Sequence, residues 1–391
     1  MTAVTHEVDV LDVDTLIDSS STRTIVCCGS GGVGKTTTAA AVAVRAAEAG
    51  RTVAVLTIDP ARRLAQALGL EEMGNEPVPV PTVDRSAGGS LDAMMLDMKR
   101  TFDEVVLNHA APDKAQQILA NPFYQAVSSS FAGTQEYMAM ERLGQLMAER
   151  VDGRPRWDLI VVDTPPSRSA LDFLDAPKRL GSFLDGRFIR LLTAPAKVGG
   201  RAYLKVVSVG VGAVSGAMAK VLGAQFLADV QTFVAALDTM FGGFRERAEQ
   251  TFALLQDPGT AFLVVATPER DALREASYFV DRLDEEGMPL AGLVVNRVQM
   301  TYVPSLSAAR AVAAAESLDD EPSRSGWSPA DSAALLRLHA DIAEQSVRHA
   351  AAVGRFTASH PDIAQVQVPS AAHDVNDVEE LRQIGESLTG A

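Results

Sequence analysis

The chain has 391 residues, longer than a typical single domain, so we expect one large core enlarged by insertions, or two lobes. Apolar residues make up 47% and aromatic residues only 5%, a mixture rich in Ala and Val that is typical of buried parallel strands covered by Ala-rich helices. The net charge of −15, from 35 basic and 50 acidic residues without a basic tract, argues against nucleic acid as a partner.

Residues 1–22 form a polar, acidic segment that predicts a flexible tail ahead of a domain spanning residues 23–391. The segment lacks the basic start and the apolar stretch of a signal peptide. The most apolar later stretch, residues 206–219, is shorter than the roughly 20 residues that a membrane-spanning helix needs. We therefore expect a cytoplasmic protein, and a peripheral position at the membrane stays open.

Six short apolar runs predict the strands of a sheet. The first, residues 24–28, stops at a glycine and is followed by an Ala-rich helical stretch over residues 35–49. The other five occupy residues 52–58, 157–162, 262–266, 292–295 and 364–368. Because helical patterns separate most of these runs, they predict an α/β fold with a doubly wound, mostly parallel sheet. In such a fold the chemistry lies at the carboxyl ends of the strands.

Two long intervals, about residues 91–150 and 167–255, contain no convincing strand and predict helical insertions that form a second subdomain. Within the second interval, residues 206–244 combine small residues with Met and Phe, which suits either an adaptable client groove or an ordinary helical core. A polar stretch around residues 319–328 interrupts a further helical region.

A phosphate-loop pattern, GxxxxGK[ST], lies between the first strand and the first helix. It consists of Gly29, Ser30, Gly31, Gly32, Val33, Gly34, Lys35 and Thr36. The glycines let successive backbone N–H groups turn inward around phosphates, and the start of the helix adds the positive end of its dipole. We expect the catalytic Lys35 to contact the β- and γ-phosphates, Thr36 to bind Mg²⁺ and Thr37 to lie near the α-phosphate.

Two aspartates follow predicted strands. Asp163 closes an apolar run, where a carboxylate is costly unless it serves a metal or a hydrogen-bond network, so we predict that it binds Mg²⁺ directly or through water. Asp59 precedes Pro60, and a carboxylate there could position or deprotonate the attacking water and join the metal site. The structural alternatives are a strand-end cap at Asp163 and an Asp-Pro turn at Asp59.

The base is predicted from the residues after the fifth strand. Guanine-specific P-loop enzymes carry an Asn-Lys-x-Asp pattern at this place, whereas here Asn296 is followed by Arg297, Val298 and Gln299. No aspartate is then present for the exocyclic amine of guanine. ATP is favoured over GTP, with Asn296 and the backbone near Pro369 as the expected adenine contacts.

The chain has two cysteines, Cys27 and Cys28, which are neighbours in a predicted strand. Adjacent residues of a strand point to opposite faces, so these thiols are not expected to share a metal or to form a normal disulfide. Buried structural thiols are the simpler interpretation.

Together these motifs resemble the family of arsenical pump-driving ATPases and tail-anchored-protein targeting ATPases. The segments that carry the resemblance are, in chain order, GSGGVGKTTTAA, TIDPARRLAQAL, WDLIVVDTPPS, FLVVATPER, VVN and VQVPS. The resemblance spans about residues 23–385 and is strongest to the anion-transporter-type ATPases found as adjacent pairs in actinobacteria. It implies a deviant Walker A loop, Asp59 in switch I, Asp163 in switch II, and a nucleotide-driven dimer whose helical region carries a client-coupled surface.

The sequence also departs from the family pattern. Ser30 stands where the family has a signature lysine, whose charge reaches phosphates across the dimer. The helical region has no cysteine for a metalloid site, and the CxxC zinc clasp of the targeting ATPases is absent as well. Arg168 lies where glycine or histidine is common, and either replaces lost positive charge or is an ordinary surface residue.

From Ser30 we derive the hypothesis of a heterodimer with a sister ATPase that retains the lysine. A homodimer in which Arg62, Arg63 or Arg168 supplies the cation stays open. The expected function is a dimeric Mg²⁺-ATP-dependent ATPase that couples ATP binding and hydrolysis to the handling of an anion, a client protein of the membrane or a membrane partner. The alternative is a nucleotide-binding regulatory subunit that hydrolyses ATP weakly on its own.

Overall fold

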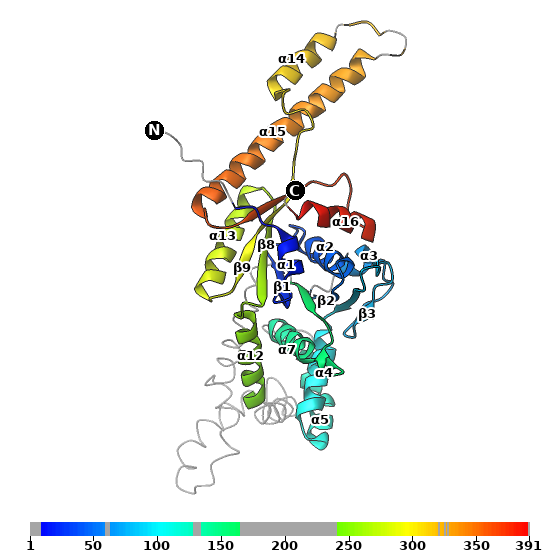
Figure 1. Ribbon diagram of the computed structural model, residues 1–391, viewed down its shortest axis with the longest axis vertical. Helices are drawn as coiled ribbons and strands as arrows, with labels where there is room; N and C mark the ends of the chain where they lie inside the picture. Colours follow the sequence, from blue (N-terminus) through cyan, green and yellow to red (C-terminus); the bar gives the residue numbers. More distant parts are fainter. Residues whose placement is uncertain are drawn as a thin grey trace, which may run out of the picture.

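The centre of the computed structural model is an eight-stranded sheet in the order β10-β9-β8-β1-β7-β2-β4-β3 (Figure 1). The structure describes residues 9–58, 63–127, 134–164, 241–319, 321–323, 326 and 328–389. The strands are β1 (Thr24–Cys28), β2 (Thr52–Thr57), β3 (Val78–Pro79), β4 (Ser90–Met95), β7 (Leu159–Asp163), β8 (Thr260–Ala266), β9 (Leu290–Val298) and β10 (Gln365–Pro369). All neighbours pair in parallel except β3, which is antiparallel to β4. The prediction of a doubly wound, mostly parallel α/β sheet is confirmed.

All six predicted strands are present, but the start of the first helical insertion was predicted incorrectly. Residues 90–95 form strand β4, which pairs along its whole length with β2. The polar Asp92 interrupts the apolar pattern of this strand, and its carboxylate accepts a hydrogen bond from Trp157 Nε1 at 2.9 Å. A buried strand can therefore contain a carboxylate that the sequence pattern alone disfavours, because a neighbouring element satisfies it.

Helices cover both faces of the sheet. One face carries α1 (Val13–Asp18), α2 (Lys35–Glu48), α3 (Arg63–Ala67) and α16 (Val378–Ser387). The other carries α4 (Met98–His109), α5 (Pro112–Leu119), α6 (Pro122–Val127), α7 (Thr134–Ala148), α12 (Phe241–Leu255), α13 (Arg270–Glu285) and α15 (Pro329–Ser359). Cys27 packs in the first layer and Cys28 in the second, as the alternation of a strand requires.

The flexible tail predicted for residues 1–22 is wrong for residues 9–22. Val13 and Ile17 of α1 are fully buried against α2, and Asp14 forms an ion pair with Arg45. The backbone of Leu11 donates to the carbonyl of Gln365, which joins this segment to β10. Its acidic residues lie on the outer side of a short amphipathic helix. The acidic composition of the segment therefore predicted a tail, although one face of the helix is apolar.

The described part of the two predicted insertions is largely helical. Helices α4, α5, α6 and α7 follow β4, with a small hairpin of β5 (Arg150–Val151) and β6 (Arg154–Pro155) before β7. Helix α12 packs against α7, where Arg247 Nε lies 3.0 Å from the buried Glu141 carboxylate. The candidate client segment falls outside the described residues from 206 to 240, and residues 241–244 belong to α12.

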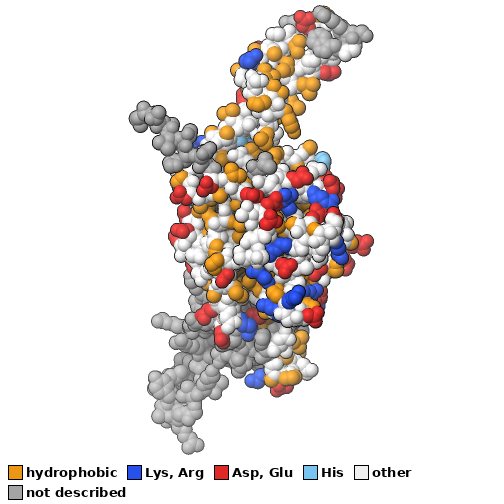
Figure 2. All heavy atoms as spheres, viewed as in Figure 1, with side chains coloured by type: hydrophobic (Ala, Val, Ile, Leu, Met, Phe, Trp, Pro, Cys, Tyr) orange, Lys and Arg blue, Asp and Glu red, His pale blue; other side chains and the backbone are white. Residues whose placement is uncertain are grey.

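A helical hairpin of α14 (Ala308–Asp319) and α15 projects from the sheet at the end of β9 (Figure 1). Alanines pack between the two helices, and the polar stretch predicted at residues 319–328 separates the two helices in the sequence. The hairpin is fastened at its base, because Gln299 N donates to Nδ1 of His349 at 3.0 Å. Burial lowers the pKa of His349, which keeps this nitrogen an acceptor. Hydrophobic side chains are exposed along the projecting arm, Leu335 and Leu338 among them (Figure 2).

Candidate active site

The phosphate loop begins where β1 ends, at a glycine with no room for a side chain. Gly29 has φ +147°, and a Cβ there would lie 2.1 Å from the carbonyl oxygen of Val265 in β8. The loop therefore leaves the sheet pressed against the neighbouring strand, which only glycine permits. The sequence pattern predicted glycine here for anion binding, and the structure adds a packing reason.

The loop is also clamped from β9. Gly34 has φ +98°, and a Cβ would lie 2.1 Å from Nδ2 of Asn296. That amide nitrogen donates to the carbonyl of Val33 at 2.8 Å, and Oδ1 of the same side chain accepts from Arg297 N at 2.9 Å. Asn296 thus holds the loop in place from the strand end where we expected an adenine contact.

Lys35 opens helix α2 and is 6% exposed. Its Nζ donates to the carbonyl of Ser30 at 2.8 Å, so the ammonium group lies across the inside of the loop. A buried ammonium group is costly without partners, and phosphate oxygens are the ligands that a P-loop lysine ordinarily receives. The Ser30 side chain is buried and its carbonyl is engaged by Lys35, so this position contributes no cation.

Asp163 lies at the carboxyl end of β7 and is completely buried. The strand register places it beside Cys27 of β1 and Thr57 of β2. Its Oδ2 accepts hydrogen bonds from Thr36 Oγ1 and from Thr57 Oγ1, both at 2.8 Å. The sequence predicted Asp163 and Thr36 separately, and the sheet brings them into direct contact.

Thr36 and Asp163 fit a magnesium ion. A threonine hydroxyl and a carboxylate are the hard oxygen ligands that Mg²⁺ takes from proteins, with phosphate and water oxygens filling the remaining positions. Among the described residues no group of three or more His, Cys, Asp or Glu side chains could hold a metal by itself. Asp59, the third predicted ligand and the predicted catalytic carboxylate, lies outside the described residues, as do Arg62 and Arg168.

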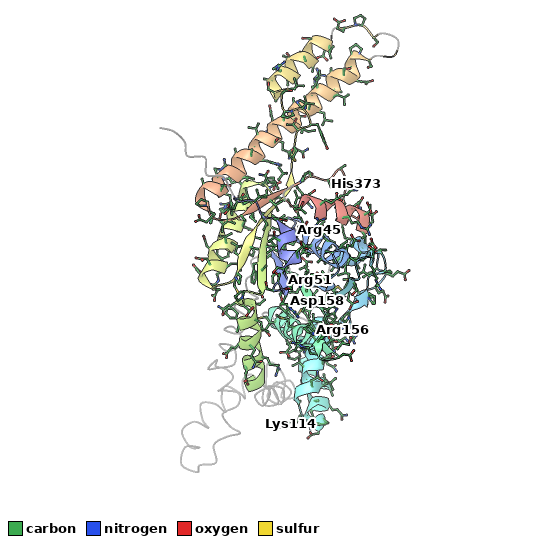
Figure 3. The ribbon with its side chains drawn as sticks, viewed as in Figure 1. Arg45, Arg51, Lys114, Arg156, Asp158 and His373 are labelled. Carbon is green, nitrogen blue, oxygen red and sulfur yellow. The ribbon has the colours of Figure 1, made fainter. Side chains whose placement is uncertain are left out.

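A cavity of about 880 Å³ opens above the phosphate loop. Seven of the predicted site residues line it: Gly32, Gly34, Lys35, Thr36, Thr37, Asn296 and Pro369. Gly29, Ser30, Gly31, Val33 and Asp163 belong to the loop and strand beneath it. His373, labelled in Figure 3, marks the same end of the molecule as the hairpin, whereas Asp158 marks the other end of β7.

Several residues around the cavity were not predicted. Residues 370–376, which follow β10, form a wall that begins at Ser370, and Thr164 lines the cavity after β7. Thr57 was missed as a partner of Asp163, although its place at the end of β2, two residues before Asp59, was a signal. Arg63 and Gln66 of α3 line the cavity as well.

The two cysteines beside this site are shielded from solvent. Both are free and fully buried in β1. Burial raises the pKa of the Cys28 thiol to about 12, and burial together with the nearby Asp163 carboxylate raises the pKa of Cys27 well above its ordinary value. Both thiols therefore stay protonated and act as small apolar side chains.

Comparisons with known proteins agree with this geometry. The family model described as anion-transporting ATPase matches residues 22–308. An ATPase GET3 from Malassezia globosa is 27% identical over 320 residues, which cover 77% of this chain and 81% of the relative. A protein of Mycobacterium tuberculosis is 34% identical over 176 residues, covering 40% of this chain and 38% of the relative.

A putative arsenical pump-driving ATPase from Halobacterium salinarum is 31% identical over 213 residues, which cover 49% of this chain and 31% of the relative. The match to the family model ends at residue 308, where helix α14 of the projecting hairpin begins. Within the described residues, no helix is long and apolar enough to cross a membrane. The match over most of the chain, together with a phosphate loop at the carboxyl end of a parallel sheet, shows that the chain belongs to the anion-transporting ATPase family and is an ATP-hydrolysing enzyme of the P-loop class.

Proposed function

We propose that the protein is a dimeric, Mg²⁺-ATP-dependent ATPase that couples nucleotide binding and hydrolysis to the handling of an anion, a client protein or a membrane partner. The observation that carries the nucleotide part of the proposal is the contact between Thr36 and Asp163 beside the buried Lys35, at the base of a cavity of about 880 Å³. A hydroxyl, a carboxylate and an ammonium group in this arrangement suit a triphosphate tail with its metal.

Each residue of the site has a role that follows from its position in the cavity. Lys35 binds phosphate oxygens and, with the backbone N–H groups of the loop, offsets their charge. Thr36 and Asp163 would hold Mg²⁺, which supplies further positive charge to the phosphates when bound. Asn296 and the backbone at Pro369 border the cavity on the β9 and β10 side, where we place the adenine. Asp59 follows β2 and is the candidate that orients the attacking water.

The Asp59→Asn variant tests the hydrolytic part. The substitution keeps the size of the side chain but removes its ability to accept a proton, so ATP should bind within about threefold of the wild-type affinity while steady-state phosphate release falls about 100-fold or more. Binding is measured by calorimetry and turnover by phosphate release. Hydrolysis at the wild-type rate would show that Asp59 has no catalytic role and would favour the alternative of a regulatory subunit.

We propose further that the partner is a sister ATPase that carries the lysine missing at Ser30. The short, buried side chain of Ser30 offers no charge to the phosphates of a second subunit, so the two sites of such a heterodimer would differ. Purification from cells should recover the sister subunit, and mixing the two purified chains should raise the ATPase rate above the sum of the separate rates. Full activity of this chain alone would contradict the heterodimer.

For the species on which the ATPase acts, we propose only a class: an anion, a client protein or a membrane partner. The relatives include an ATPase GET3 and a putative arsenical pump-driving ATPase. The two cysteines of this chain both lie in β1 as protonated, buried thiols, so thiolate ligation of arsenite is not part of the proposal. The same copurification that identifies the sister subunit would reveal a bound membrane protein or other client.

A further inference from the structure

The cavity is bordered by a cation that belongs neither to the phosphate loop nor to the strand-end aspartates. Arg63 is the first residue of α3 and lines the cavity together with Lys35, Thr36 and Thr37. The cavity belongs to a protein with a net charge of −15, yet its lining has three basic side chains and one acidic side chain: Lys35, Arg63 and Arg297 against Asp374. Such a local excess of positive charge matches a polyphosphate.

The sequence of α3 determines which way Arg63 faces. Leu64 and Leu68 are fully buried and Ala67 nearly so, in the same core cluster that contains Val33 of the phosphate loop. These three contacts attach one side of the short helix to the body. Arg63 and Gln66, three residues apart, are therefore left on the side of the cavity, where both are exposed.

The guanidinium group of Arg63 has no partner within the described residues. No hydrogen bond or ion pair joins its side chain to any of the described residues, which are 9–58, 63–127, 134–164, 241–319, 321–323, 326 and 328–389. Other arginines of the chain have carboxylate partners, for example Arg45 with Asp14 and Arg382 with Glu48. An arginine that faces a cavity without a protein partner is available to a ligand with planar or branched anionic groups.

The topology places Arg63 at the phosphate end of the cavity. Helix α3 follows β2, which lies beyond β7 and its Asp163 as seen from β1. The expected base contacts lie on the opposite side of β1, because Asn296 is near the end of β9 and Pro369 ends β10. A nucleotide whose base lies between β9 and β10 and whose phosphates reach Thr36 and Asp163 therefore extends its terminal phosphate toward α3.

We propose that Arg63 binds the terminal phosphate of the nucleotide from within the same subunit and thereby discriminates ATP from ADP. The inference rests on the proposed nucleotide-binding function of this cavity. It differs from the heterodimer hypothesis because the cation comes from this chain and is present without a partner.

The test is nucleotide binding to the full-length chain, diluted until sedimentation shows a monomer, measured with Mg²⁺-ATP and Mg²⁺-ADP. Arg63→Ala should weaken ATP binding about 10- to 100-fold, the usual range for one charge-assisted hydrogen-bonded contact, and ADP binding less than about threefold. Arg63→Lys should recover part of the ATP affinity, since lysine restores the positive charge but not the paired N–H donors of the guanidinium group. Arg355→Ala, an exposed position on α15, is the neutral control.

Arg297→Ala is the comparison within the cavity. It removes the same charge from the end of β9, on the other side of the cavity, so it should weaken the binding of ATP and of ADP by similar factors and leave the ratio of the two affinities unchanged. If wild-type protein binds ATP and Arg63→Ala leaves the ratio of ATP to ADP affinity unchanged, the assignment of Arg63 is overturned while the proposed function stands. If wild-type protein binds neither nucleotide, the proposed function itself fails.

A double variant separates the two sources of charge. Ser30→Lys introduces the family's signature cation, which acts on the phosphates of the opposite subunit. The double variant should bind ATP as weakly as Arg63→Ala when it is a monomer. At concentrations where two copies associate, its ATP affinity should rise. Restoration in the monomer would overturn the placement of the position-30 cation in the opposite subunit, and the ratio of ATP to ADP affinity in Arg63→Ala would still decide the role of Arg63.

Discussion

Replacement of Lys35 by alanine is expected to lower the affinity for Mg²⁺-ATP by at least about 100-fold. Lys35 is 6% exposed and its ammonium group lies across the loop, against the carbonyl of Ser30, so the side chain is largely shielded from water before the nucleotide arrives. Charge-assisted contacts in such surroundings are stronger than those on the surface, because little water competes for the charge. The measurement is calorimetric titration of the variant with Mg²⁺-ATP.

The control for this variant is Lys114→Ala. Lys114 lies on α5, far from the cavity end marked by His373 (Figure 3), and should leave ATP binding unchanged. Thermal unfolding of both variants distinguishes a lost ligand contact from a lost fold. Because the cavity left by Lys35 can admit water, we expect the variant to fold. Wild-type affinity in folded Lys35→Ala would remove the basis for a nucleotide in this cavity.

The second large effect is expected for Asp163→Asn. The isosteric amide can still accept from Thr36 and Thr57 through its oxygen, but it lacks the negative charge that attracts a divalent cation. ATP hydrolysis should fall about 100-fold or more, and the nucleotide affinity should lose its dependence on Mg²⁺. Titration of ATP affinity against Mg²⁺ concentration measures this directly.

Asp158→Asn provides a matched control on the same strand segment. Asp158 precedes β7 at the opposite end, next to Arg51 (Figure 3), and its Oδ2 accepts from Thr52 Oγ1 at 2.8 Å. The same substitution there removes a carboxylate of the sheet without reaching the cavity, so the activity per folded molecule should be unchanged. If Asp163→Asn keeps the wild-type Mg²⁺ dependence, Asp163 does not take part in metal binding.

Local sequence patterns predicted most of the sheet because its central strands are continuous apolar runs bounded by turn residues. The run at residues 24–28 coincides with β1, and the glycine-rich segment after it forms the loop as predicted. Strand β4 was not predicted because Asp92 interrupts its apolar pattern. The hydrogen-bond partner of Asp92, Trp157, lies 65 residues further along the chain. Helix α1 was not predicted because it is very short and its acidic residues outweigh its buried Val13 and Ile17 in the composition of the segment.

In the site, too, some residues could be predicted from local sequence patterns and others could not. Lys35, Thr36 and Asp163 could be named from the chain alone, since each occupies a place in a motif whose chemistry requires that residue type. That Asn296 donates to the carbonyl of Val33, 263 residues away in sequence, could not be named, because it depends on how β9 is placed in the sheet. The orientation of Arg63 likewise depends on the burial of Leu64 and Leu68.

By itself, then, the sequence determined the fold class, the phosphate loop and the residue types around a triphosphate, because these follow from short-range periodicity and from spacing within single segments. Only the tertiary structure decided which side chains meet: Thr36 and Thr57 on one carboxylate oxygen, Asn296 on the loop, and Arg63 beside Lys35 in the lining of one cavity. Strand order and register set these contacts, and both arise from pairing between segments that are far apart in the chain.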